Sequence, residues 1–182
     1  MSTAGRAGRW LCALACYAVG ATSCAPREAQ AVSQNELLVR SLMDALQSAD
    51  TAAITEIFWP EAVYDDYASQ LQYRGLEEIV GYVTSVHSWA DDVYMNVGEV
   101  HVSRTGAVAE WLFAGVQARP RGEVVLDVTN RDVVMNGVTI IEVDGGRIRR
   151  AADYTDTTPM LLQLGGRMTL PGGGVMEMDQ PR

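Results

Sequence analysis

A tight turn followed by a short strand, late in the chain, constrains the fold more than any other stretch. Residues 144–156 read Asp-Gly-Gly-Arg-Ile-Arg-Arg-Ala-Ala-Asp-Tyr-Thr-Asp. The paired glycines are typical of a turn, and side chains of the strand that follows alternate between two faces. Asp153 therefore shares a face with Ala151 and Thr155. We expect this carboxylate, set among small residues, at the floor of a pocket around which other strands curve.

The first 24 residues have the organisation of a secretory signal. Two arginines precede an apolar run from Trp10 to Ala21, which is too short to span a bilayer. Small residues follow and end at Cys24, as in bacterial lipoprotein signals, where the cysteine is lipidated. Ala21 departs from the leucine usual in that signal, so ordinary signal-peptidase cleavage is the alternative. We predict a signal peptide over 1–24 and an exported, periplasmic or cell-envelope protein whose only membrane contact is the lipid on Cys24.

Composition excludes several classes of chemistry. All three cysteines lie in the leader, so the mature chain has no disulfide, thiolate nucleophile or cysteine metal ligand. The formal charge is -9 and the chain has no lysine, which excludes a Schiff-base lysine and argues against nucleic acid as a partner. His87 and His101 lie far apart without a regular carboxylate spacing. We therefore expect no metal and no cofactor.

The pattern of apolar residues predicts three helices before most of the strands. Residues 25–34 are polar and small, as in a linker. Leu38, Leu42 and Ala45 then recur at helical spacing, and Asp50 is placed to cap a second helix. The predicted helices cover 35–48, 51–58 and 76–88.

The remaining periodic stretches alternate as strands do. They cover 62–67, 93–103, 107–117, 123–143 and 147–155. This order predicts an α+β fold for residues 35–158, a cone-shaped, strongly bent antiparallel sheet wrapped over three N-terminal helices. Residues 159–182, rich in glycine, proline and methionine, are expected to form a flexible tail.

Five short phrases, in order, resemble the SnoaL-like branch of the nuclear transport factor 2-like superfamily. They occupy 42–50, 62–66, 73–75, 142–148 and 153–156. The resemblance implies the cone fold, with a ligand in its mouth, and a homodimer formed through the open sheet face. It does not specify an activity, because members include epoxide hydrolases, polyketide ester cyclases, ketosteroid isomerases and dehydratases.

Residue by residue, the resemblance to limonene epoxide hydrolase is partial. Tyr64 and Asp66 occupy the places of a tyrosine and an asparagine that hold the attacking water in that enzyme. Asp153 matches the aspartate on its last strand. The central arginine and aspartate of its Asp-Arg-Asp arrangement fall on Trp111 and Phe113. The water-activating apparatus of that enzyme is therefore missing here.

Asp66 and Asp153 are the candidate catalytic pair. Asp66 aligns with the general base of ketosteroid isomerase, although the oxyanion-hole tyrosine of that enzyme falls on Leu42. Two carboxylates at one mouth would raise at least one pKa toward neutrality, and Tyr64 could donate a hydrogen bond to a carbonyl or epoxide oxygen. The alternative is structural: Tyr64 packs in the wall, and both carboxylates form salt bridges with nearby arginines such as Arg74 or Arg149.

Four other residues are candidates for substrate binding. Trp111, Phe113 and Met135 could stack on a hydrophobic ligand or, alternatively, fill the cone and abolish the cavity. His87 lies on the inward side of the third helix near its end, where histidines also cap or pack. We therefore predict cofactor-free acid-base chemistry of the isomerase, dehydratase, cyclase or epoxide hydrolase type on a small, largely hydrophobic molecule. The alternative is a non-catalytic ligand-binding or dimerisation module.

Overall fold

The computed structural model of the chain describes residues 25–123 and 125–177. The signal peptide and lipidated cysteine predicted for 1–24 lie outside the described residues. No helix among those described is long and apolar enough to cross a membrane.

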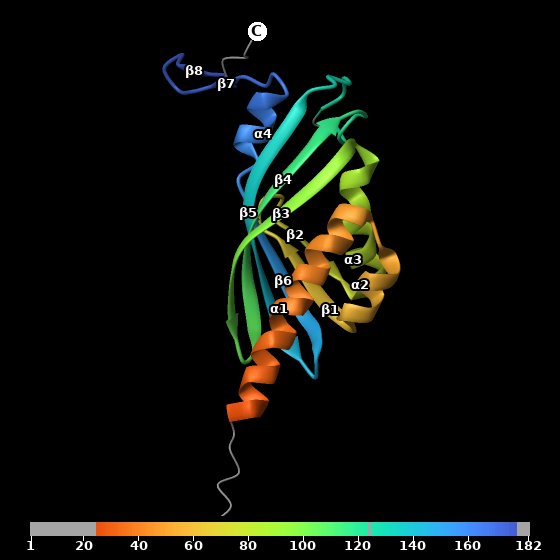
Figure 1. The fold of residues 1–182 in the computed structure, drawn as a ribbon. Coiled ribbons are helices and arrows are strands. Elements are labelled where there is room, and N and C mark those ends of the chain that lie inside the picture. Colours follow the sequence, from red (N-terminus) through yellow and green to blue (C-terminus); the bar gives the residue numbers. More distant parts are fainter. Residues whose placement is uncertain (1–24, 124, 178–182) are drawn as a thin grey trace, which may run out of the picture.

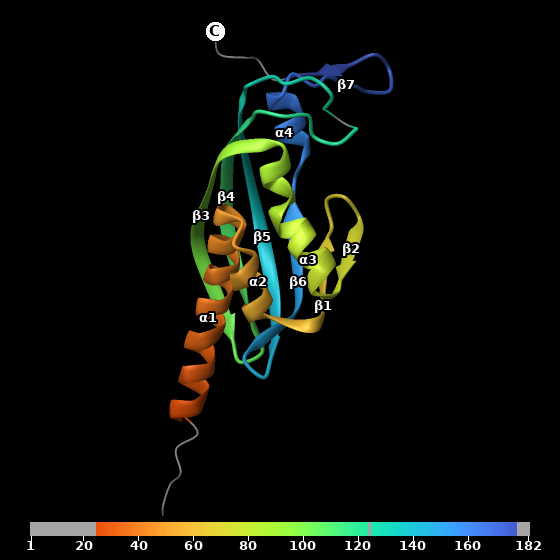
Figure 2. The same cartoon turned by 90° about the vertical axis from the view of Figure 1, so that its right-hand side faces the viewer.

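A strongly curved six-stranded sheet forms the body, with three helices on one of its faces (Figures 1 and 2). The strand order is β2-β1-β6-β5-β4-β3. The strands are β1 (Phe58–Asp66), β2 (Leu71–Arg74), β3 (Ala90–Ser103), β4 (Gly106–Gln117), β5 (Asp132–Asp144) and β6 (Arg147–Thr155). The helices are α1 (Ala25–Ser48), α2 (Thr51–Ile57) and α3 (Gly75–Thr84), followed by the 3-10 turn η1 (Ser85–Ser88). The predicted α+β cone is confirmed, with one difference: β1 and β6 run parallel.

Helix α1 presents the predicted apolar stripe to the sheet. Leu38, Leu42 and Ala45 are buried in the main core together with Val39 and Met43. The helix begins earlier than predicted, so the expected linker at 25–34 is helical. That stretch is rich in alanine and has no glycine, and its one proline lies in the first turn, where helices accept proline.

The cap predicted for the second helix is present. The Asp50 carboxylate accepts hydrogen bonds from the backbone N–H groups of Ala52 and Ala53, both at 3.0 Å. The chain then leaves the helix directly into β1, which sends Phe58 and Tyr64 into the core. The cap therefore fixes where α2 begins.

The strand predicted for 123–143 begins only at Asp132, because a long loop, residues 118–131, precedes it. The fully buried Gln117 side chain holds this loop together. Its Nε2 donates to the carbonyl oxygens of Arg119 and Asp127, and its Oε1 accepts from the N–H and hydroxyl of Thr129. These loop groups thus bind one amide side chain instead of a neighbouring strand.

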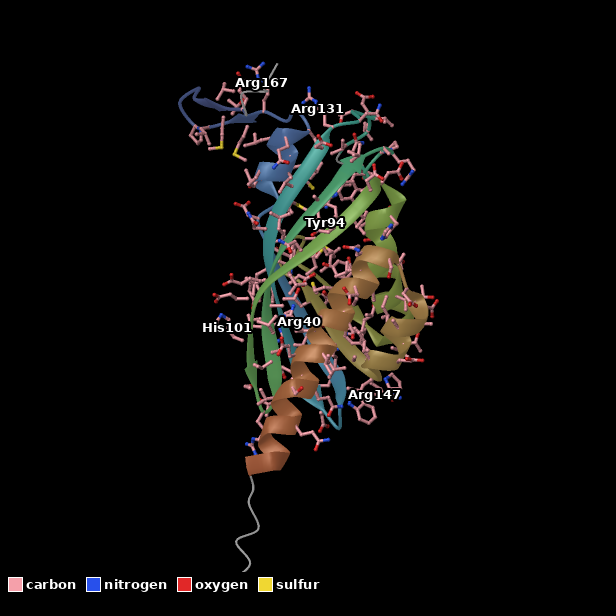
Figure 3. The ribbon with its side chains drawn as sticks, in the orientation of Figure 1. Arg40, Tyr94, His101, Arg131, Arg147 and Arg167 are labelled. Carbon is pink, nitrogen blue, oxygen red and sulfur yellow. The ribbon has the colours of Figure 1, made fainter. Side chains whose placement is uncertain are left out.

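Within residues 158–177, part of the predicted flexible tail, the chain forms one short helix and two short strands. Helix α4 (Thr158–Gln163) packs against β5, and β7 (Met168–Thr169) pairs with β8 (Val175–Met176). Together with the 118–131 loop, this region forms the upper end of the molecule in Figure 2. Figure 3 shows Arg131 and Arg167 at this end and Arg147 at the opposite, narrow end.

Candidate active site in the mouth of the cone

A cavity of about 130 Å³ lies in the mouth of the cone, between the inner face of the sheet and the end of α3. Its walls are mostly aromatic and thioether side chains: Trp89, Met95, Trp111, Phe113 and Met135. Tyr82, Asp66 and Asp153 supply polar groups. Exposed Ala68 and Ser85 lie at its rim, whereas Asp153 is only 5% exposed and forms its floor.

Strand pairing positions Asp153 in the middle of the sheet. It lies beside Asp66 of β1 on one side and Thr139 of β5 on the other. Next along its own face comes Ala151, and Ala109 lies beyond Thr139 on β4; both alanines are fully buried. Small side chains therefore lie beside the carboxylate on its face of the sheet.

Three hydroxyl groups donate hydrogen bonds to the Asp153 carboxylate. Tyr64 and Tyr82 donate to Oδ2 at 2.9 and 3.0 Å, and Thr139 donates to Oδ1 at 2.5 Å. Trp111 Nε1 in turn donates to the Thr139 hydroxyl at 2.8 Å. The Thr139 oxygen accepts the indole hydrogen, so its own single hydrogen points to the other partner, the Asp153 carboxylate.

The carboxylate has no cationic partner within the described part of the chain. Arg149 pairs instead with Glu142, and Arg74 donates its backbone N–H to Glu78. Burial raises the pKa of Asp153 to about 6, and the charge of Asp66 adds to the rise, although the three hydroxyl bonds oppose it. Both the acid and the base form of Asp153 are therefore populated near neutral pH.

The two tyrosines that contact Asp153 differ in their access to the cavity. Tyr82 lines it, whereas Tyr64 is fully buried behind Asp153 and is not part of its lining. Their rings are tilted against each other with centroids 4.7 Å apart. Burial is the main cause that raises the pKa of both, so both stay protonated and act as donors.

Asp66 lines the cavity, but its oxygens serve a turn. Oδ1 accepts from the N–H groups of Ala68 and Ser69, and Oδ2 accepts from the Ser69 hydroxyl at 2.6 Å. The side chain therefore shapes the rim and adds negative charge there. Asp66 and Asp153 both line the cavity, and of the two only Asp153 is buried.

The predicted ligand-binding residues divide into two groups. Trp111, Phe113 and Met135 line the cavity and narrow it without closing it. His87 is not among the lining residues, because its Nε2 bonds to the Leu46 carbonyl oxygen at 3.0 Å and ties η1 to α1. A carbonyl oxygen only accepts, so this nitrogen carries the hydrogen.

Two residues of the site were missed by sequence reasoning. Tyr82 lies three residues after Ile79 and four before Val86, hence on the predicted inward stripe of α3. Thr139 lies directly across from Asp153, but the predicted strand had no register that would pair them. Helical spacing could have identified Tyr82, whereas Thr139 is identified only by the pairing of β5 with β6.

Two larger hollows contain no buried titratable group in their lining. One of about 440 Å³ lies by the bend of β3, β4 and β5, near Gly98 and Gly137, and the other, of about 490 Å³, lies beside α4. Among the described residues, no group of three or more histidine, cysteine or acidic side chains could hold a metal ion. The Asp153 cavity is therefore the candidate site.

Comparison with known proteins agrees with this architecture. The family model described as the SnoaL-like domain matches residues 39–151. The chain belongs to the SnoaL-like family. None of the curated proteins compared with it gives a significant match.

Solved structures with the nuclear transport factor 2-like cone have low sequence identity to this SnoaL-like chain. TsrD from Streptomyces laurentii is 20% identical, with a TM-score of 0.63, over 73% of this chain and 96% of its own. An LEH-like epoxide hydrolase from M. tuberculosis is 18% identical, with a TM-score of 0.57, over 76% of this chain and 92% of the hydrolase. A ketosteroid isomerase-like protein from Catenulispora acidiphila, in complex with trimethylamine, is 18% identical, with a TM-score of 0.60, over 70% and 92%. These likenesses concern the fold.

Proposed function

We propose that this SnoaL-like protein is an enzyme that moves protons on a small, largely hydrophobic molecule without a cofactor. Asp153 is the catalytic acid-base residue. The observation that carries the proposal is a carboxyl group with a pKa of about 6, buried at the floor of an aromatic-walled cavity and oriented by three hydroxyls. General acids and bases work best when their pKa lies near the working pH.

The chemistry follows from two of the polar groups that line the cavity, the Asp153 carboxyl and the Tyr82 hydroxyl. Ionised Asp153 removes a proton from carbon next to a carbonyl. The electron pair of the broken C–H bond forms a C=C bond, and the π pair of the carbonyl moves onto its oxygen. Tyr82 turns its hydroxyl to that oxygen as Asp153 becomes protonated, because a neutral carboxyl needs fewer donors. Protonated Asp153 then returns the proton to another carbon or to a leaving hydroxyl. Tyr64 and Thr139 are positioning residues.

The volume of the cavity limits the reacting group. Benzene is known to enter an apolar cavity of about 150 Å³, and this one measures about 130 Å³. The part of the substrate held at Asp153 therefore has about six non-hydrogen atoms or fewer. Trimethylamine, present with the Catenulispora relative, is a molecule of this size class. Isomerisation, dehydration, cyclisation and epoxide opening all need only such a reacting centre.

The test is base-catalysed deuterium exchange at the α-carbon of small ketones, from acetone to cyclopentanone, followed by NMR in D2O. The exchange rate is expected to rise about tenfold per unit as pH increases toward 6 and to level off above it, because the base form requires loss of the Asp153 proton. A steroid-sized ketone serves as the size control and should not exchange. A rate that is independent of pH between 4.5 and 7.5 would contradict the assignment of Asp153.

A non-catalytic ligand-binding or dimerisation module is the second candidate. The bulk of Trp111 and Phe113 in the cone favours it, as do the exposed Tyr94, Val134 and Tyr154 on the sheet strands. A homodimer formed through this sheet would bury those side chains. Sedimentation equilibrium that shows a dimer, together with ligand binding but no exchange with any small ketone, would favour the module over the enzyme.

We further propose that the protein is exported and held in the cell envelope by a lipid on Cys24. The support is the basic and apolar leader that ends in small residues before this cysteine. Cys24→Ser is expected to move the protein from the membrane fraction to the soluble fraction of fractionated cells. The Cys16→Ser variant, altered within the apolar run, should stay with the membrane. Unchanged membrane association of Cys24→Ser would rule out the lipid anchor.

A further inference from the structure

The cavity at Asp153 has a neighbour on the same end of the molecule. A cleft of about 490 Å³ lies between the 118–131 loop and the segment that follows β6. Leu126, Leu161, Leu162, Leu164 and Met168 supply its apolar lining. Figure 2 shows this loop beside α4 at the wide end of the cone.

The Asp153 cavity and this cleft are lined by residues that are neighbours in the chain or paired through their backbones. Thr157 lines the cavity and Thr158 lines the cleft. Across from them, Arg121 lines the cavity and is paired with Val125, which lines the cleft, through backbone hydrogen bonds of 2.8 and 3.3 Å. The Arg121–Val125 pair therefore lies at the boundary between the cavity and the cleft.

The cleft contains apolar surface that the fold itself does not cover. Leu126 is 70% exposed and Met168 is 40% exposed. Two charged residues, Asp127 and Arg167, also line the cleft, and Arg167 pairs with Glu177. Apolar side chains gathered in a cleft next to a catalytic group are typical of a ligand subsite.

We propose that this cleft binds an aliphatic chain attached to the group that reacts at Asp153. The substrate is then an elongated amphiphile, with a short carbonyl or epoxide head in the cavity and an apolar tail that passes the Arg121–Val125 pair into the cleft. The proposal rests on the proposed function for the position of the head. It follows from the size mismatch between a cavity of about 130 Å³ and an adjoining apolar cleft of about 490 Å³. One wall of the cleft, residues 158–168, lies outside the stretch that matches the family model.

Binding of a homologous series of methyl ketones, from 2-butanone to 2-decanone, tests the proposal by calorimetry with the full mature chain. Affinity is expected to be nearly flat for the shortest members. It should then rise about three- to fourfold with each methylene that enters the cleft. Leu126→Glu and Met168→Glu each place a charge in the lining and should remove this gain while leaving 2-butanone binding unchanged. Both residues are exposed enough for the fold to tolerate the change.

Val175→Glu is the matched control. Val175 is 50% exposed on the strand that pairs with the one carrying Met168, and it does not line the cleft. It should retain the full gain with chain length. Affinity that does not depend on chain length would overturn the proposal, as would a gain that persists in Leu126→Glu. Binding that strengthens with chain length, but without deuterium exchange, would support the cleft and reject the proposed catalysis. Exchange of short ketones, with binding that does not depend on chain length, would support the catalysis and reject the cleft.

Discussion

Asp153→Asn is expected to lower the rate of ketone deuterium exchange at least about 100-fold, because loss of a general base typically costs 10²–10⁴. The amide occupies the same space, so the cavity and its walls remain. Its oxygen can still accept from Tyr64 and Tyr82, and its N–H group can donate to the second lone pair of the Thr139 hydroxyl. The loss therefore reports on proton transfer and not on binding.

Stability provides an independent readout of the same variant. The native pKa of Asp153, about 6, lies above the ordinary aspartate value of 3.8, so the native state binds more protons than the unfolded chain between pH 4 and 6. Wild-type stability should therefore fall as pH rises through that window, by on the order of 3 kcal/mol. Urea denaturation of Asp153→Asn should lack this part of the pH dependence.

Asp144→Asn is the control for both measurements. Asp144 is exposed at the end of β5 and does not line the cavity, so exchange and pH-dependent stability should match the wild type. Exchange at the wild-type rate in Asp153→Asn would remove Asp153 from the mechanism. Equal losses in both variants would indicate a general effect of negative charge.

Trp111→Ala is expected to reduce the free energy of unfolding by about 3–5 kcal/mol, the usual cost of removing a large buried aromatic side chain. The Trp111 ring is nearly buried and lies over Gly137, where even one added carbon would meet the ring at 2.3 Å. Its removal also deprives the Thr139 hydroxyl of a donor. Denaturation in urea, followed by circular dichroism, measures the loss.

Two further variants separate the contributions of Trp111. Trp111→Phe keeps most of the packing but removes the N–H group, so about 1–2 kcal/mol of loss is expected. Trp59→Ala removes an indole that is 37% exposed and donates to the Asp144 carbonyl oxygen, and it should cost less than Trp111→Ala. An alanine variant at Trp111 as stable as wild type would show that this ring does not support the cone.

The elements that sequence reasoning predicted correctly are those whose signals are local. The apolar stripe of α1, the Asp50 cap and the Gly145-Gly146 turn each depend on residues within one or two turns of chain. The error at 123–131 has a non-local cause. Those residues read as strand, but the buried amide of Gln117 binds their backbone and side-chain groups into a loop. No periodicity within the segment encodes that partner.

By itself the sequence determined the α+β class, which follows from the order of its periodic segments. It also determined the alternation that turns Asp153 inward, because this follows from spacing along one strand. Only the tertiary structure decided which groups meet that carboxylate. Tyr64, Tyr82 and Thr139 come from a strand, a helix and another strand, and strand register brings their hydroxyls together at one side chain. Burial among them raises the pKa of Asp153, and burial is a property of the packed fold.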